Sequence, residues 1–267
     1  MPELTVATFN LHAGIDGWGR PFDVISACAA LEADVVLLQE TWTPEDGEAL
    51  APLVAAAGGY EVHEARLSGA LMFEPSSRTS RRWGPSRRDP RARPLWVGDA
   101  ATLRRVRARR PSAEAHFGRW GLALLSRLPV GRVETIELGQ LRRDGPERRA
   151  ALLGEVKVEG SVLTVVGTHL AHFQHGSPLM LARLRRRLPE PTRPALLAGD
   201  MNFWGPPVAL ALPGWRRAVR ARTYPSWGAH SQIDHILVTR PVRVLSGGSV
   251  RVGGSDHLPL RVRLALV

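Results

Sequence analysis

The chain has 267 residues, which suits one large domain or two small ones with a sizeable core, and its hydrophobic content of 44% argues against a disordered chain. Its single cysteine, Cys28, excludes an internal disulfide and a zinc–thiolate centre. No apolar run approaches the ~18 residues that span a bilayer, and the first residues lack a secretion signal, so we expect a monomeric protein of the cytoplasm without a transmembrane segment.

The net charge of +11 is concentrated in one part of the chain. The segment from Arg78 to Arg110 holds twelve arginines and two aspartates, a local net charge of +10. Such a segment attracts phosphate polyanions, either nucleic acid or an anionic lipid surface. A solvated, partly mobile insertion is the alternative interpretation. We expect a single domain over residues 1–267, with an Arg-rich insertion at about 78–110.

The first elements alternate between strand and helix patterns. Residues 4–9 alternate apolar and small polar side chains, as a strand does, and residues 21–31 carry an apolar helical face. Residues 34–39, with the sequence DVVLLQ, form the continuous apolar run of a strand that is covered on both faces. This order predicts a strand–helix–strand unit.

A second helix is predicted to begin at Thr43, a capping residue that is followed by Pro44 at the first helical position. Gly58 and Gly59 predict its end. Residues 60–73 are predicted to form two short strands, before the Arg-rich segment.

The second half of the chain contains mostly strand patterns, joined by short turns, with one helical pattern at residues 179–188. Short turns favour antiparallel pairing, whereas the first strand–helix–strand unit favours parallel pairing. We therefore predict an α/β (α+β) fold, a four-layered sandwich of two packed mixed β-sheets flanked by helices. The predicted strands are residues 121–126, 130–138, 152–158, 162–168, 195–198, 233–238, 242–252 and 260–266.

Polar groups follow several of these apolar runs. Asn10 closes the strand predicted at residues 4–9, and Glu40 directly follows the strand predicted at residues 34–39. If these two strands are neighbours, both side chains reach one hard cation. Oxygen ligands of this kind suit magnesium or manganese rather than zinc. Asp200 and Asn202 are two residues apart, so on an extended chain they share a face, where a carboxylate and an amide can activate and orient water. A turn or a surface position is the alternative for each residue alone.

Histidines supply the second group of candidates. Asp234 pairing with His257 would orient the imidazole and raise its basicity, leaving Asp256 free to face a metal. His169 follows a strand and is expected to face a phosphate, and the nearby His172 and His175 are expected to lie at the edge of the site or in solvent rather than to form a zinc cluster. The remaining histidines are interpreted as surface or structural residues: His12, His63, His116 and His230.

Seven blocks follow one another along nearly the whole chain: Asn10, Glu40, GLALLSR at 121–127, GTH at 167–169, GDMN at 199–202, IDH at 233–235 and SDH at 255–257. Their sequences and order resemble the motifs of the endonuclease/exonuclease/phosphatase superfamily. The resemblance implies a four-layered sandwich, which agrees with the fold expected from the strand patterns.

The resemblance also implies roles for these residues. Glu40 would be the principal ligand of Mg²⁺ or Mn²⁺, with Asn10 and Asp256 as further ligands. His169 would contact the scissile phosphate. The remaining roles fall to two pairs: Asp200 with Asn202 would orient and activate the attacking water, and Asp234 with His257 would form an acid/base and phosphate-binding pair. Either Asp200 or His257 would remove the proton from water.

Three functions are compatible with the sequence. A divalent-metal-dependent phosphodiesterase that acts on nucleic acid is favoured by the basic segment. The alternative is a phosphohydrolase for a phospholipid headgroup, similar to a sphingomyelinase, or for a small phosphate ester. A non-catalytic binding protein is disfavoured, since it would not need so many metal- and phosphate-competent groups.

Overall fold

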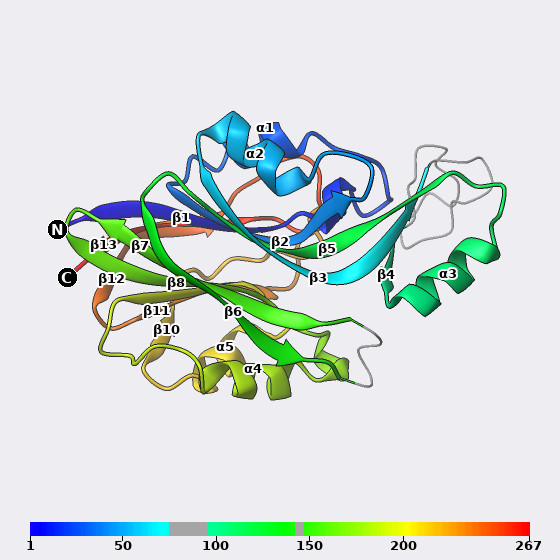
Figure 1. The fold of residues 1–267 in the computed structure, drawn as a ribbon. Helices are drawn as coiled ribbons and strands as arrows, with labels where there is room; N and C mark the ends of the chain where they lie inside the picture. Colours follow the sequence, from blue (N-terminus) through cyan, green and yellow to red (C-terminus); the bar gives the residue numbers. More distant parts are fainter. Residues whose placement is uncertain (75–94, 142–146) are drawn as a thin grey trace.

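The computed structural model describes residues 1–74, 95–141 and 147–267. These residues form a seven-stranded and a six-stranded sheet that pack face to face, with helices on the outer surfaces (Figure 1). Helices α1 (Val24–Ala29) and α2 (Leu50–Gly58) cover the larger sheet, and α4 (Ser177–Arg185) and α5 (Gly205–Leu210) cover the smaller one. This arrangement confirms the predicted four-layered α/β sandwich.

The larger sheet has the strand order β12-β13-β1-β2-β5-β3-β4. The adjacent strands β1 (Glu3–Asn10) and β2 (Val35–Pro44) are parallel, and the other neighbouring pairs of this sheet are antiparallel. The remaining members are β3 (Glu61–Phe73), β4 (Leu95–Gly98), β5 (Ala115–Ser126), β12 (Val242–Ser249) and β13 (Leu260–Leu266).

The smaller sheet has the order β10-β11-β9-β8-β7-β6. Here β8 (Ser161–His169) and β9 (Ala195–Asp200) are parallel, and the other pairs are antiparallel. Both sheets are therefore mixed, as predicted. The other members are β6 (Val130–Gly139), β7 (Arg149–Val158), β10 (Trp215–Arg217) and β11 (Asp234–Thr239).

Alternation along the strands separates the main core from two outer cores. Leu4 and Val6 of β1 face the space between the sheets, whereas Ala7 and Phe9 face α1 and α2. In β2 the two faces are both apolar, which confirms a strand covered on both sides. In β1 the two faces differ, so a slip of one residue would turn Ala7 and Phe9 to the main core, and burial therefore fixes its register.

Two predictions for the first half of the chain are wrong. Thr43 does not cap a helix: β2 continues to Pro44, with Thr43 opposite Arg119 of β5, and α2 begins only at Leu50. The pairing with β5 outweighs the local capping signal. Residues 61–73 form one strand, interrupted by an irregularity between Arg66 and Ser68, rather than two. The end of α2 is as predicted, with Gly59 in the left-handed conformation.

Part of the Arg-rich segment has regular structure. Residues 95–98 form β4 at the edge of the larger sheet, and α3 (Ala100–Ala108) follows, with Leu103 packed against Leu71 and Phe73. Residues 78–94 of the predicted insertion lie outside the described residues. In Figure 1, β3, β4 and α3 extend past the right-hand end of the sandwich.

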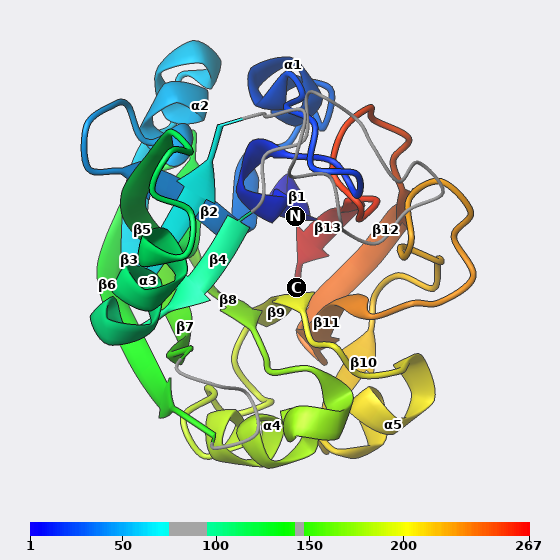
Figure 2. The ribbon, with the colours of Figure 1, turned by 90° about the vertical axis from the view of Figure 1, so that its right-hand side faces the viewer.

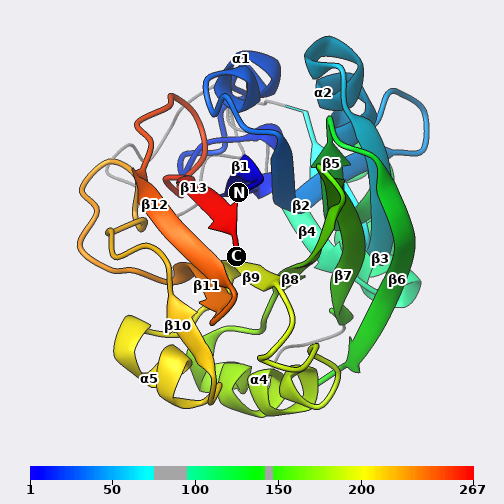
Figure 3. The same cartoon turned by 90° about the vertical axis from the view of Figure 1, so that its left-hand side faces the viewer.

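The two ends of the sandwich differ. The N- and C-termini lie near one another at one end (Figure 3). The carboxyl ends of β1, β8 and β9 lie at the other end, which faces the viewer in Figure 2. None of the described helices is long and apolar enough to cross a membrane.

Candidate active site

The strand alternation that builds the core also delivers polar residues to one end of it. In β1, β8, β9 and β11, every second side chain faces the space between the sheets. Continuing this alternation to one end of each strand reaches a polar residue, which therefore points to the same side as the core residues. Pairing aligns these ends, with His169 opposite Asp200 and Asp200 opposite Asp234. Asn10 occupies the corresponding position in β1, beside Gln39 of β2.

Glu40 reaches this position through a bulge and not at a strand end. The pairing of β2 with β5 skips Glu40, between Gln39 and Thr41, and its φ is +52°. Without the bulge the Glu40 side chain would point to the same side as Val36 and Leu38, which face the outer helices. The bulge brings Oε1 of Glu40 to 3.1 Å from Nδ2 of Asn10. The two strands are thus neighbours, as the sequence interpretation required.

Asp200 lies at the centre of the cluster and is 2% exposed. Its Oδ2 accepts a hydrogen bond from Nδ2 of Asn10 at 3.2 Å and lies 3.5 Å from Nε2 of His169 and 3.7 Å from Nε2 of His257. Gly199 precedes it with a φ of +142°, and a Cβ there would lie 1.9 Å from the carbonyl oxygen of Thr168. Glycine is therefore required for the close approach of β8 and β9 at this end.

Asn202 is near Asp200, but not because the chain is extended. Its φ is +47°, and its backbone N–H donates to Oδ1 of Asp200 at 2.9 Å, so the segment turns back on itself. The Asn202 amide Nδ2 donates to the carbonyl of Leu170 at 3.1 Å and lies 3.4 Å from Nε2 of His169. The expectation of a shared strand face is wrong, although Asp200 bonds the Asn202 backbone and both side chains lie near His169.

Asp234 and His257 form the predicted pair. Oδ2 of Asp234 and Nδ1 of His257 are 2.9 Å apart, and both side chains are buried. The ring of Tyr224 lies against His257, with centroids 4.9 Å apart. Held from both sides, the imidazole directs Nε2 towards Asp200.

Asp256 stands apart from the other carboxylates. Its Oδ1 lies 3.3 Å from the Ser255 hydroxyl oxygen and 3.5 Å from Nδ1 of His12. The Ser255 hydroxyl donates its hydrogen to the carbonyl of Asn10 at 2.7 Å, which ties this loop to β1. The structure therefore brings seven of the eight predicted residues into one chain of contacts and places Asp256 beside it.

Burial and neighbouring charge shift the pKa values within the cluster. Burial, helped by the charges of Asp234 and Glu40, raises the pKa of Asp200 to about 7 against the opposing charge of His257. Burial, followed by the charges of Arg149 and His257, lowers the pKa of His169 well below its ordinary value. A neutral His169 therefore faces a carboxyl group that resists ionisation.

His257 behaves in the opposite way. Burial lowers its pKa, but the carboxylates of Asp234, Asp200 and Asp256 outweigh burial and raise the pKa well above its ordinary value. The cluster therefore separates a neutral imidazole from a protonated one, which is an arrangement typical of acid–base sites.

The donor set fits a divalent cation. Asp200, Asp234 and His257 each offer one ligand atom, and these atoms lie within 4.8 Å of one another. Glu40 adds a further carboxylate beside Asp200, since both accept from Nδ2 of Asn10, whereas Oδ1 of Asn10 accepts from the backbone N–H of His12 at 3.0 Å. A cation would offset the charge repulsion that raises the pKa of Asp200. This set of Asp200, Asp234 and His257 differs from the predicted metal ligands, which are Asn10, Glu40 and Asp256. Asp234 is already bonded to His257. The carboxylates of Asp200 and Glu40 are therefore the better place for a hard cation.

Sequence reasoning missed two neighbours of the cluster, His12 and Arg149. His12, interpreted as a surface or structural residue, lies beside Asp256. Trp120 packs on His169, with centroids 5.2 Å apart, and the buried Arg149 lies 5.1 Å from the Trp120 ring. These contacts join distant segments, so no local pattern could reveal them. Outside the cluster, His172 and His175 are exposed, as expected, and their rings contact one another.

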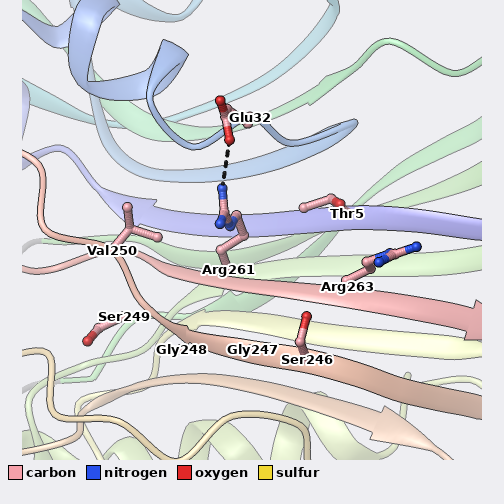
Figure 4. Close-up of a pocket in the computed structure, with 9 residues that line it drawn as sticks. All are labelled: Thr5, Glu32, Ser246, Gly247, Gly248, Ser249, Val250, Arg261 and Arg263. Atoms are coloured by element: carbon pink, nitrogen blue, oxygen red, sulfur yellow. Dashed lines mark hydrogen bonds and ion pairs between the residues drawn. The ribbon is translucent and has the colours of Figure 1, made fainter.

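A separate groove of about 490 Å³ lies on the outer face of the larger sheet (Figure 4). Arg261 and Arg263 line it, but Glu32 pairs with the first at 3.3 Å and Glu3 with the second at 2.6 Å. The groove is thus on the opposite face of β1 and β13 from the cluster, and its arginines are already neutralised.

Comparison with solved structures agrees with the fold. An endonuclease/exonuclease/phosphatase from Beutenbergia cavernae superposes with a TM-score of 0.65 at 21% identity, covering 100% of this chain and 72% of that one. A family protein from Leptotrichia buccalis gives 0.63 at 12% identity, over 98% and 100% of the two chains. TDP2 from D. rerio, in complex with a single-strand DNA product, gives 0.58 at 16% identity, over 98% and 99%.

The family itself is established by sequence. No curated protein matches the chain. The model of the endonuclease/exonuclease/phosphatase family, however, matches residues 7–257, which include every residue of the cluster. The chain therefore belongs to the endonuclease/exonuclease/phosphatase family, whose members are generally metal-dependent hydrolases of phosphodiester bonds.

Proposed function

We propose that this protein is a divalent-metal-dependent phosphodiesterase that hydrolyses nucleic acid by in-line attack of an activated water. The observation that carries the proposal is the convergence of Asn10, Glu40, His169 and Asp200 with the His257–Asp234 pair in one buried cluster. Carboxylates, an amide and two imidazoles of different charge can supply the acid–base catalysis and the charge stabilisation that speed hydrolysis of a phosphodiester.

In this proposal Glu40 holds Mg²⁺ or Mn²⁺ with Asn10 and Asp256. Glu40 is suited to this role because its carboxylate remains 18% exposed and accepts an amide hydrogen bond from Asn10. Asp256, on the neighbouring loop, is 17% exposed and close enough to the cluster for its charge to act on His257. When bound, the cation neutralises charge on the phosphate and on the leaving oxygen.

Asp200 accepts a proton from the attacking water, and Asn202 orients that water. The Asn202 N–H holds Oδ1 of Asp200, which leaves Oδ2 directed at the other polar groups of the cluster. His169 donates from Nε2 to a phosphate oxygen as a neutral imidazole, in a position supported by the packed ring of Trp120. Donors fixed before the substrate arrives stabilise the charge that develops on phosphorus at little reorganisation cost.

His257 supplies a protonated imidazole on the other side of Asp200. Its Nδ1–H donates to Asp234, so its Nε2–H is available to a phosphate oxygen or to the leaving oxygen. The orientation of the ring depends on Asp234, which makes Asp234 a positioning residue in this scheme.

Nucleic acid is the substrate best supported. The net charge of +11 and the five arginines of residues 104–110 favour a polyanion. The similar D. rerio TDP2 structure contains a single-strand DNA product. A phospholipid headgroup or a small phosphate ester would use the same cluster but would not need the basic segment.

Nicking of supercoiled plasmid tests the proposal, with magnesium, with chelator and with the variant Asp200→Ala. Asp200→Ala should lower the rate by about 10²- to 10⁴-fold or more, with folding retained. Asp46→Ala, at an exposed turn, is the matched control and should be as active as the parent. Near-normal nicking by Asp200→Ala would contradict the mechanism. Hydrolysis of small phosphate esters or phospholipid without nicking would contradict nucleic acid as the substrate.

A further inference from the structure

Beside the cluster, two tryptophans from distant loops pack against one another with their rings tilted by 45°. The rings of Trp18 and Trp227 have centroids 4.7 Å apart, and the guanidinium of Arg20 lies 4.9 Å from the Trp18 ring on the same loop. We call these three residues the indole platform. Trp18 is backed by Arg20 and contacts Trp227, whereas Trp227 remains 48% exposed. Trp227 is therefore the more exposed of the two rings.

The platform is built into the fold and is not a chance surface contact. Asp16 accepts from the backbone N–H groups of Trp18 and Arg20, each at 2.9 Å, and from Nε of Arg20 at 2.6 Å. Ile15 and Pro21 form a bridge that closes the loop. On the other side, the residue before Trp227, Ser226, donates twice to the backbone of the loop that carries Asp256, at 2.7 Å each.

Gly17 connects the platform to the cluster. A Cβ at Gly17 would lie 2.2 Å from the Trp227 ring and 3.2 Å from Cβ of Asp256. Trp227 therefore occupies space that a side chain at position 17 would fill, and it does so next to a proposed metal ligand. A large, half-exposed aromatic ring is held at the edge of the site, where a substrate must extend beyond its phosphate.

We propose that the indole platform binds a nucleobase next to the scissile phosphate, by stacking on the exposed side of Trp227. This inference rests on the proposed function, because it assigns a base-binding role to the surface beside the same site. A base is one sugar away from its phosphate, and every base offers a planar face to an indole. Trp18, itself packed on Arg20, contacts Trp227 and so reduces the conformational freedom that Trp227 would lose on binding.

A membrane is the other surface that tryptophans contact, but the platform suits it less well. Arg20, the basic residue of the platform, is paired with Asp16, and Asp256 and Asp16 both lie close by. These residues therefore offer an anionic lipid surface no excess positive charge. Stacking on a base needs no such charge.

The test compares binding of two single strands by fluorescence anisotropy in the presence of chelator, so that turnover plays no part. One is a short oligothymidylate and the other is an abasic strand with the same number of phosphates. The parent protein should bind the first about 5- to 150-fold more tightly, as expected for one stacked base. Trp227→Ala should bring this ratio close to one, and Trp227→Phe should keep part of it.

Trp204→Ala is the matched control, because Trp204 is 52% exposed and packs on Phe173 instead of on the platform. It should leave the ratio unchanged. An unchanged ratio in Trp227→Ala, or a ratio abolished in Trp204→Ala, would overturn the assignment. So would adsorption to phosphatidylcholine vesicles that depends on Trp227 while the ratio does not.

The outcome is separable from that of the proposed function. If plasmid nicking is absent but the ratio depends on Trp227, the activity is wrong and the platform stands. If nicking depends on Asp200 but the ratio does not depend on Trp227, the activity stands and the platform is wrong. Circular dichroism of each variant confirms folding before binding is compared.

Discussion

Glu40 and Asn202 both hold backbone conformations that residues with a Cβ rarely adopt. Their φ angles are +52° and +47°, in the left-handed region. Such conformations cost on the order of 1–3 kcal/mol each and persist only where the surroundings enforce them. In both cases the unusual φ directs a polar side chain to Asp200 or to its neighbours. Conformational free energy is therefore used to place functional groups.

This strain gives a prediction for Glu40. Glu40→Gly and Glu40→Ala both remove the carboxylate, but only glycine adopts a φ of +52° without steric cost. We expect both variants to lose phosphodiesterase activity, and Glu40→Gly to be more stable than Glu40→Ala by about 1 kcal/mol. Urea unfolding followed by circular dichroism measures the difference. Equal stability of the two variants would show that the bulge is not strained.

A second prediction concerns His235, the buried neighbour of Asp234. Its Nε2 lies 2.7 Å from the carbonyl of Phe203, and burial lowers its pKa to about 4. The unfolded chain therefore binds a proton near pH 6.5 that the folded protein binds only near pH 4, so folding stability falls as the pH falls through this window. Between pH 7.5 and pH 5 the loss of stability from this residue should be about 2 kcal/mol.

His235→Gln provides the comparison, because it retains a donor for Phe203 but does not titrate in this range. Urea unfolding at both pH values should give a pH-dependent loss that is smaller in the variant than in the parent by the same amount. If the two proteins lose stability equally, His235 is not held neutral in the folded state.

At the scale of elements, the position of Glu40 depends on three adjacent strands. Gly121 of β5 lies opposite Thr41, just after the bulge in β2, and opposite Arg66, just before the irregularity in β3. A Cβ at Gly121 would lie 2.1 Å from the carbonyl oxygen of Ala65. The missing side chain lets the irregular strands on both sides approach β5. Gly121 begins the GLALLSR block, so this motif has a structural reason.

Gly121→Ala is therefore expected to act on the site through the sheet. The clash with backbone atoms cannot be relieved by a side-chain rotation, so we expect destabilisation of about 2–4 kcal/mol and a strong loss of activity. Gly131→Ala in β6 is the control, because a Cβ there would lie 3.6 Å from its nearest neighbour, and it should change stability by less than about 1 kcal/mol. Thermal unfolding and plasmid nicking measure the stability and the activity of the two variants. Equal stability and equal activity of Gly121→Ala and Gly131→Ala would contradict the role of Gly121.

The elements also show where sequence patterns suffice. Apolar strand patterns predicted most strands and placed Asn10, His169 and Asp200 at strand ends, because burial of a strand gives a local sequence pattern. They failed for the bulge at Glu40 and for the continuation of β2 to Pro44, because both depend on pairing with β5, which is distant in sequence. They also missed α3, where arginines mask a helical face with the single buried residue Leu103.

For the whole molecule, the position of α3 matters more than its length. It lies on the part of the larger sheet that extends beyond the sandwich, at the end where the cluster lies (Figures 1 and 2). Arg104 and Arg105 are exposed on it, whereas Arg240 and Arg243 are exposed around the turn between β11 and β12, away from the carboxyl end of β9. Substituting either pair of arginines therefore changes the net charge of the protein by the same amount, but at a different place on the molecule.

This difference gives a prediction about binding to duplex DNA. If α3 lies against phosphates, the double variant Arg104→Glu/Arg105→Glu should reduce the slope of log affinity against log salt by about 0.9 for each phosphate that these arginines neutralise. Arg240→Glu/Arg243→Glu has the same net charge and should keep the slope of the parent. Anisotropy titrations at several salt concentrations, in chelator, measure both. Equal slopes in the two variants would mean that the molecule attracts DNA through its total charge alone. A reduced slope only for the α3 variant would make α3 an extension of the substrate-binding surface beyond the cluster.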